Sequence, residues 1–214
     1  MPARAAPGAA PVRQGGLMAY EVVRRRMEYD GALVRVRVDT VVQPDGSRAE
    51  REVAEHADSV AIVAVDDRQR VLLIRQYRHP AGQYLWELPA GLCDKPGEPP
   101  LGTAQRELAE EAQLRAAAWR TLVDLRPSPG ISTEVCRVYQ AEQLEAEEQA
   151  GGRPDEESEL RSRWVPLRQA VSEVLTGRIT NGLAVAGLLA AAAGADAALA
   201  RIRPADAPWP GTAQ

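Results

Sequence analysis

The chain has 214 residues, a formal net charge of −4, and 45% hydrophobic and 26% charged residues. This balance is typical of one globular domain with a small appendage, and the negative charge argues against a nucleic-acid or anionic-membrane binder. No apolar run reaches membrane-spanning length without interruption, and the two cysteines form neither a disulfide framework nor a CxxC pair. We therefore expect a cytoplasmic protein that binds neither nucleic acid nor membrane.

The first 57 residues divide into a tail and a small sheet. Residues 1–17 are rich in Pro, Gly, Ala and Arg and lack the apolar core of a signal peptide, which predicts a disordered tail. Within 18–57, apolar and charged residues alternate over Val34–Val38, as in a half-exposed strand, and Pro44–Gly46 is typical of a turn between strands. We read 18–57 as a small antiparallel sheet.

The segment 58–203 mixes strands and helices without regular βαβ alternation, which predicts an α+β or mixed α/β sandwich. The acidic stretch 145–159 contains Gly and Pro and is read as a loop. Residues 204–214 are expected to form a loose tail. Strand patterns lie within 59–78, 84–91, 119–130, 134–144 and 162–167, and helix patterns lie within 98–114, 168–178 and 181–202.

Three carboxylates stand close together in the first of these helices. Glu107, Glu110 and Glu111 occupy positions i, i+3 and i+4, so they share one face, and each like-charged pair costs about 0.2–0.5 kcal/mol. A divalent cation would reverse this repulsion, and Mg²⁺ prefers carboxylate oxygens. The alternative is a solvated charged face. An apolar stripe that can pack on a sheet runs beside it: Leu101, Ala104, Leu108 and Ala112.

The stretch Gly91–Leu114 resembles the Nudix box, G-x5-E-x7-R-E-U-x-E-E-x-G-U, where U is aliphatic. Gly91 lies one residue too far from the first glutamate, and Gln113 replaces the late glycine, which predicts an altered helix end. The stretches WELPAG, RQYRH, REV and SPGISTE further resemble ADP-ribose pyrophosphatases, over about Tyr20 to Leu189. The box residues that match are Glu98, Arg106, Glu107, Leu108, Glu110, Glu111 and Leu114.

The resemblance implies a Nudix α/β/α sandwich with a mixed sheet, an added N-terminal antiparallel sheet at 18–57 that forms a homodimer, and a Nudix domain at 58–203. It also implies Mg²⁺ as cofactor, with Mn²⁺ as a substitute. Glu107 and Glu111 would be direct ligands with a catalytic role, Glu110 would share or bridge, and the carbonyl of Ala90 would complete the shell. Arg106 and Glu98 are read as an ion pair that braces loop against helix.

Further roles follow from the same resemblance. Glu157 would be the catalytic base, with Glu156 as the alternative and an ordinary acidic loop as the bland reading. Arg78 would contact the diphosphate or terminal ribose, unless it is a surface arginine of a sheet edge. Arg51 and Glu52 would reach across the dimer to adenine, in composite active sites, unless they only pair within the N-terminal sheet.

The reaction that we expect is Mg²⁺-dependent hydrolysis of ADP-ribose to AMP and ribose 5-phosphate. One alternative is another nucleotide sugar or an oxidised nucleoside diphosphate as substrate. Others are a non-catalytic Nudix ligand-sensing module and a structural domain with an acidic helix. Sensing modules usually lose box carboxylates, and all three remain here.

Overall fold

A computed structural model of the chain describes residues 13–14, 17–18, 20–147, 161–195 and 203–210. These residues fall into two compact units. Unit 1 comprises residues 1–57 and 128–134, and unit 2 comprises residues 58–127 and 135–214. Within the described ranges, none of the helices has the length and apolar character needed to cross a membrane.

Unit 2 contains a mixed sheet and an antiparallel one. The mixed sheet has the order β13-β10-β11-β6-β9, in which β11 runs parallel to β6 and the other pairs are antiparallel. The antiparallel sheet has the order β12-β7-β8, and the short helix η1 (His79–Ala81) joins β7 to β8. The strands are β6 (Ser59–Ala64), β7 (Arg70–Arg78), β8 (Gln83–Glu87), β9 (Ala90–Leu92), β10 (Leu114–Leu125), β11 (Cys136–Ala146), β12 (Arg161–Pro166) and β13 (Arg203–Pro204).

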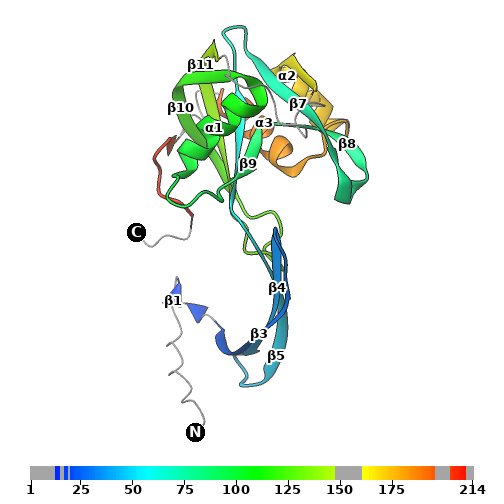
Figure 1. Ribbon diagram of the computed structural model, residues 1–214, viewed down its shortest axis with the longest axis vertical. Helices are drawn as coiled ribbons and strands as arrows, with labels where there is room; N and C mark the ends of the chain where they lie inside the picture. Colours follow the sequence, from blue (N-terminus) through cyan, green and yellow to red (C-terminus); the bar gives the residue numbers. More distant parts are fainter. Residues whose placement is uncertain (1–12, 15–16, 19, 148–160, 196–202, 211–214) are drawn as a thin grey trace. The chain divides into compact units, whose positions relative to one another are not determined.

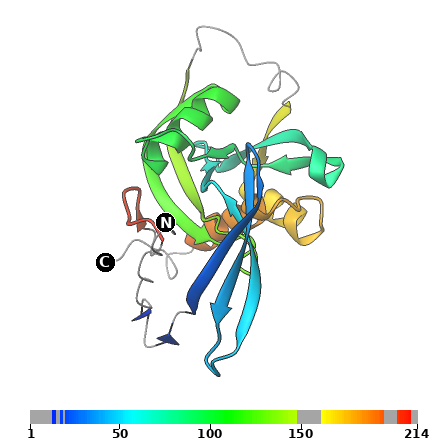
Figure 2. The same cartoon turned by 60° about the horizontal axis from the view of Figure 1, so that its bottom comes forward.

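Helices cover both faces of these strands. Alternate residues of β6 point to opposite faces, so Val60 and Ile62 pack with α1 (Pro100–Ala112), while Ala61 and Val63 pack with α2 (Leu167–Leu175) and α3 (Gly182–Gly194). Figures 1 and 2 agree that α1 lies on one side of the strands and α2 and α3 on the other. The predicted α/β/α sandwich is confirmed. So is the predicted packing stripe of α1, formed by Leu101, Ala104, Leu108 and Ala112.

Unit 1 is built on the antiparallel sheet β3-β4-β5, formed by Glu21–Asp30, Val34–Val42 and Arg48–His56. The predicted small sheet is therefore confirmed, and Gly46 takes the positive φ of 82° that the turn requires. The loop 128–134 binds to β5 through two backbone hydrogen bonds at Ala54, of 2.7 and 3.1 Å.

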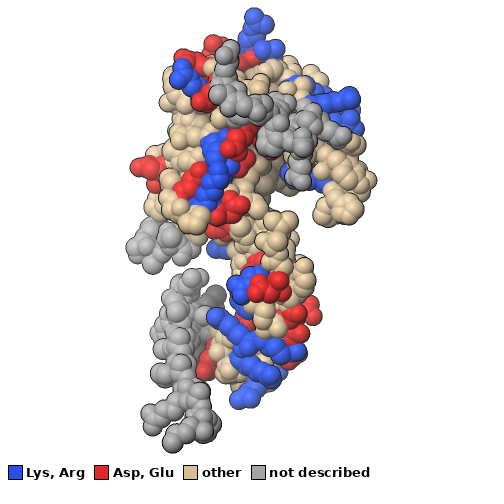
Figure 3. Space-filling model, viewed as in Figure 1, with Lys and Arg blue, Asp and Glu red and all other residues tan. Residues whose placement is uncertain are grey.

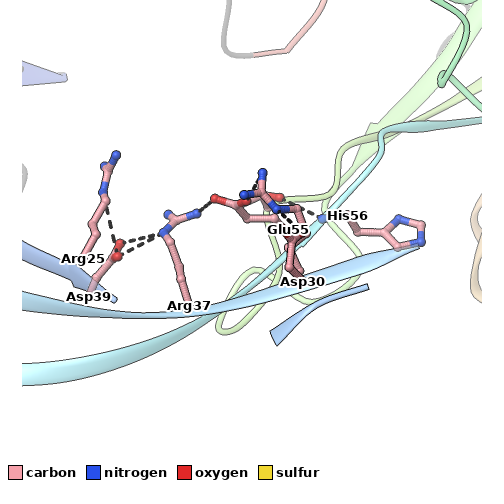
Figure 4. A network of polar contacts seen from close by, with 8 residues as sticks. Arg25, Asp30, Arg37, Asp39, Glu55 and His56 are labelled. Atoms are coloured by element: carbon pink, nitrogen blue, oxygen red, sulfur yellow. Dashed lines mark hydrogen bonds and ion pairs between the residues drawn. The ribbon is translucent and has the colours of Figure 1, made fainter. Parts of the chain in front are cut away.

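One face of the unit 1 sheet carries a polar network (Figure 4). The carboxylate of Asp39 accepts a hydrogen bond of 3.0 Å from Arg37 and lies 3.8 Å from Arg25, and Arg37 also pairs with Glu55. The expected disordered tail 1–17 lies mostly outside the described residues, and its described part pairs β1 (Arg13–Gln14) with β2 (Leu17–Met18).

The segment 203–210, which we call the C-terminal clasp, is held in place, whereas the sequence predicted a loose tail from residue 204. Arg137 is only 2% exposed, and its guanidinium donates to the backbone carbonyls of Ala207 at 2.6 Å and Pro208 at 2.7 Å. It also stacks on the ring of Trp209 at 4.9 Å, and Trp209 donates to Asp58 at 3.0 Å. A buried cation thus anchors the proline-containing segment.

Candidate active site

Helix α1 ends at Gln113 in the left-handed conformation that glycine usually supplies. Gln113 has φ 55° and ψ 41°, and its N–H donates to the carbonyl of Ala109 at 2.9 Å. The prediction of an altered helix end is therefore wrong. A non-glycine residue in this conformation costs on the order of 1–2 kcal/mol, and the packing of the helix offsets this cost.

The Glu107 side chain of α1 occupies the space beside Gly91 of β9. A Cβ atom on Gly91 would lie 2.2 Å from Cδ and Oε1 of Glu107, closer than any real contact. The missing side chain therefore lets the Glu107 carboxylate lie against the strand. Gly91 therefore contacts the box helix although its spacing departs from the family pattern.

Arg106 gathers the first carboxylates of the helix and its leading loop. Its Nε and Nη2 donate to the two oxygens of Glu98, each at 3.1 Å, and Thr103 donates to Glu98 at 2.9 Å. Its Nη1 lies 2.5 Å from Glu107 and 2.9 Å from Glu110. The predicted ion pair between loop and helix is confirmed, and the hydrogen bond from Arg106 is the main cause of the lowered pKa of Glu98. On the surface over α1, basic side chains lie between acidic ones (Figure 3).

Glu111 is buried against the edge strand β9. Glu111 is only 6% exposed, and its Oε2 accepts a hydrogen bond of 2.9 Å from the backbone N–H of Ala90. The carbonyl of Pro89 accepts a hydrogen bond from Ile62, and the N–H of Cys93 donates to the carbonyl of Asp58. Because backbone groups alternate along a strand, those of Ala90 point to the opposite edge of β9. Its carbonyl therefore points to the same edge as the N–H that meets Glu111.

The donor set fits a hard divalent cation. Glu107, Glu110, Glu111 and the carbonyl of Ala90 offer only oxygen, which Mg²⁺ prefers. In the described part of the chain no three such side chains already form a metal centre. Nη1 of Arg106 contacts both Glu107 and Glu110. A metal ion that bound these two carboxylates would replace the guanidinium of Arg106 as their positive partner.

Arg78 is held by a buried glutamate that the sequence reasoning did not single out. Glu87, the glutamate of WELPAG, is 2% exposed and accepts from Arg78 at 2.7, 3.0 and 3.2 Å. The hydrogen bonds from Arg78 to Glu87, followed by the charges of Glu87 and Glu111, raise the pKa of Arg78, although burial opposes this. Arg78 therefore interacts electrostatically with Glu111 of α1.

The NUDIX domain model matches residues 55–184, which is more than half of the chain. The chain belongs to the NUDIX family. It is 44% identical to an ADP-ribose pyrophosphatase of Mycobacterium tuberculosis over 89% of this chain and 91% of that protein. It is 32% identical to a methanol dehydrogenase activator of Bacillus methanolicus over 67% of this chain and 77% of the relative. The crystal structure of an ADP compounds hydrolase shares the Nudix fold, with TM-score 0.72 and 23% identity, over 84% and 95% of the two chains.

The two residues predicted to bind adenine lie on β5 of unit 1. In the register with β4, Arg51 lies opposite Asp39 and Glu52 lies opposite Val38, so their side chains belong to opposite faces of the sheet. The structure therefore does not bring the two together on one face. Both are exposed, and Arg51 donates to the carbonyl of Glu50 at 3.0 Å.

The predicted base of this Nudix site lies in a part of the chain that the structure leaves undescribed. Glu157 and its alternative Glu156 fall within residues 148–160, outside the described ranges. The assignment of the base therefore stays a prediction. It rests on the resemblance alone, whereas the site on α1 also rests on contacts in the structure.

Proposed function

We propose that this Nudix protein hydrolyses ADP-ribose to AMP and ribose 5-phosphate with the help of Mg²⁺, for which Mn²⁺ can substitute. The observation that carries the substrate is the 44% identity to an ADP-ribose pyrophosphatase along nearly the whole of both chains. The chemistry agrees with it, because the α1 face offers several carboxylates beside an arginine. The reducing cytoplasm is the expected compartment, and Cys93 and Cys136 form no disulfide in the described part of the chain.

The residues of the α1 face have separate tasks in this proposal. Glu107, Glu111 and the carbonyl of Ala90 would hold the metal directly, and Glu110 would share it. When bound, the metal supplies charge neutralisation for the diphosphate and a water of lowered pKa. Arg106 braces the loop through Glu98, and its Nη1 contacts Glu107 and Glu110.

Proton transfer is assigned to Glu157. Its carboxylate would take a proton from the water that attacks one phosphorus atom, while the bond from that phosphorus to the bridging oxygen breaks. The bridging oxygen leaves with the other phosphate, which gives the two monophosphate products. Arg78 would bind the diphosphate, because a guanidinium matches phosphate oxygens in geometry and charge.

The homodimer and its composite sites belong to the same proposal. The three-stranded sheet of unit 1 exposes several large apolar side chains on β3 and is too small to form a core alone, so it needs a partner surface. A second copy of the chain is the partner we propose, with Arg51 or Glu52 reaching the adenine of the other copy. The exposed apolar residues of β3 are Val22, Val23, Met27 and Tyr29.

Subunit exchange tests the shared site. A chain with Arg51→Ala and Glu52→Ala is mixed with a Glu111→Gln chain, and each mixed dimer then holds one intact site. We expect activity to return toward half of wild type per mixed dimer. If mass spectrometry shows exchange and no activity returns, adenine is not bound across the dimer.

The substrate is tested by a panel of diphosphates assayed side by side with Mg²⁺. We expect ADP-ribose to give the highest kcat/KM, with AMP and ribose 5-phosphate as products. The panel includes a second nucleotide sugar such as GDP-mannose and an oxidised nucleoside diphosphate. A kcat/KM about tenfold higher for either would replace ADP-ribose as the substrate, and binding without turnover would favour the sensing module.

A further inference from the structure

A salt bridge runs along one face of the β7–β8 hairpin, from Arg78 to Glu87. In the strand register Arg78 lies opposite Gln83, whereas Glu87 lies opposite Ile74. The arginine side chain therefore reaches along the sheet, across the row of Gln76, to meet the carboxylate. Arg78 and Glu87 are therefore not cross-strand neighbours, and they meet because the arginine side chain extends along the strands.

The contact uses one edge of the guanidinium. Nε donates to Oε1 of Glu87 at 3.0 Å, and Nη2 donates to Oε2 at 2.7 Å. An arginine has five N–H donors, and this two-point contact leaves the end edge, formed by Nη1 and the second N–H of Nη2. Two parallel N–H groups on one edge match the spacing of phosphate oxygens.

The two partners differ in exposure. The Glu87 side chain is 2% exposed, and that of Arg78 is 45% exposed. A buried carboxylate thus fixes a guanidinium whose other end reaches the surface. Gln76 lies between them on the same face, and its Oε1 is buried without a hydrogen-bond donor among the described residues. This face carries hydrogen-bonding capacity that the described fold does not use.

The Arg78 cation also interacts with the charge of one α1 carboxylate. The charge of Glu111 contributes to the stabilisation of the Arg78 cation, next to that of Glu87. An anion that lies against the α1 face is therefore within the electrostatic reach of Arg78.

We propose that Glu87 is a positioning residue, which holds Arg78 by its Nε–Nη2 edge so that the Nη1–Nη2 edge is presented to the substrate diphosphate. The proposal rests on the proposed function for the identity of the substrate. Without Glu87 the arginine loses its fixed rotamer, and substrate binding must then supply the ordering that the salt bridge supplies now. Glu87 therefore acts on substrate affinity, through Arg78, and touches no reacting atom.

A double-mutant cycle tests this role. The variants are Glu87→Gln, which keeps one acceptor oxygen without the charge, and Arg78→Lys, which keeps the charge without the two-point edge. We expect each to raise KM for ADP-ribose roughly tenfold or more, with a much smaller change in kcat. Because both changes break one unit, the double variant should have a KM no higher than the worse single variant.

The matched control is Glu173→Gln. Glu173 is also a buried carboxylate paired with an arginine, Arg163, but it lies on α2. We expect this variant to lose stability while its KM stays that of wild type. If Glu87→Gln behaves in the same way, with a lower Tm and an unchanged KM, Glu87 only supports the fold and the proposal is wrong. Multiplying effects in the double variant would also contradict it.

A second readout separates this proposal from the proposed function. Inorganic pyrophosphate is titrated into each folded variant by calorimetry in the presence of Mg²⁺. We expect Glu87→Gln and Arg78→Lys to weaken its binding, and Glu173→Gln to leave it unchanged. If the wild type fails to hydrolyse ADP-ribose, the proposed function is wrong, and pyrophosphate affinity alone then decides the role of Glu87. If Glu87→Gln does not fold, the pyrophosphate affinity of Arg78→Lys decides the role of Glu87. The Arg78 side chain is about half exposed, so its replacement should leave the fold intact.

Discussion

Two arginines of unit 2 gather oxygen atoms in contrasting ways. Arg106 contacts three carboxylates, so the surface around it keeps an excess of negative charge. Arg137 contacts one carboxylate, that of Asp124, and two neutral carbonyls of the C-terminal clasp, and a second arginine, Arg203, pairs with the same aspartate at 2.6 Å. The first cluster lacks positive charge, whereas the second has no such deficit.

The contrast separates a site from a support. Repelling carboxylates oppose folding slightly and favour any added cation. A buried arginine whose three nitrogens all have hydrogen-bond acceptors, as in Arg137, stabilises the chain around it. Variants of the first cluster should therefore change catalysis more than stability, and variants of the second should do the reverse.

The largest effect is expected for Glu111→Gln. The change removes a charged ligand, so hydrolysis at saturating Mg²⁺ should fall by orders of magnitude. The amide oxygen can still accept from Ala90, and one like-charge repulsion disappears, so metal-free stability should stay within about 0.5 kcal/mol. Glu145→Gln, at an exposed pair with Arg115 on β11, serves as the control and should keep full activity. Turnover near that of wild type in Glu111→Gln would remove it from the ligand set.

The next effect concerns the base. Loss of a general base typically lowers the rate by about 10²–10⁴-fold, and we expect a fall of kcat in this range for Glu157→Gln. Mg²⁺ affinity, measured by calorimetry, should not change, because the α1 carboxylates remain. Glu156→Gln is the matched neighbour. If it shows the loss and Glu157→Gln does not, the base is Glu156.

Arg137→Met tests the supporting cluster. The change leaves Asp124 with Arg203 as its one remaining arginine partner and removes the donor for two carbonyls of the clasp. Breaking a buried charge pair typically costs about 3–5 kcal/mol, and we expect this loss in urea unfolding. Arg115→Met, at an exposed pair, should cost about 0.2–1 kcal/mol. The folded fraction of Arg137→Met should keep the kcat of wild type. A lower kcat would contradict the view that this cluster serves stability alone.

The smallest effect is expected for Gly91→Ala, which joins the two kinds of change. The new methyl group collides with the Glu107 side chain, so we expect weaker Mg²⁺ binding and a stability loss of about 1–3 kcal/mol from overpacking. Gly182→Ala, where a methyl group meets nothing within 4 Å, is the control. Unchanged Mg²⁺ affinity in Gly91→Ala would mean that the position of Glu107 against β9 is unimportant for the metal.

Local patterns predicted the parts of the fold that depend on periodicity. The period of α1 predicted both its apolar stripe and the shared face of Glu107, Glu110 and Glu111, and both follow from helical geometry. The same argument with a period of two shows that neighbours on one strand, such as Arg51 and Glu52, face opposite sides of a sheet. The sequence alone therefore suffices to place the two side chains on opposite faces.

Contacts between distant positions were beyond the sequence. Two partners of Arg137 are backbone carbonyls about 70 residues away, and a backbone acceptor cannot be recognised from the sequence. The clasp therefore looked like a loose, proline-rich end. Glu87 was overlooked because a single charged residue in a strand does not reveal whether it is buried. Gln113 shows the converse, since a missing glycine did not prevent the left-handed helix end.

The central claim is that the carboxylates of α1 form a site for Mg²⁺, and stability measured against Mg²⁺ concentration tests it most directly. A cation that binds only the folded chain stabilises it by about 2.7 kcal/mol at one hundred times its dissociation constant. We predict that the unfolding free energy of the wild type rises in this way with Mg²⁺, and that the Glu111→Gln variant shows little or no rise. Equal rises in the two proteins would contradict the account, because the cation would then bind elsewhere.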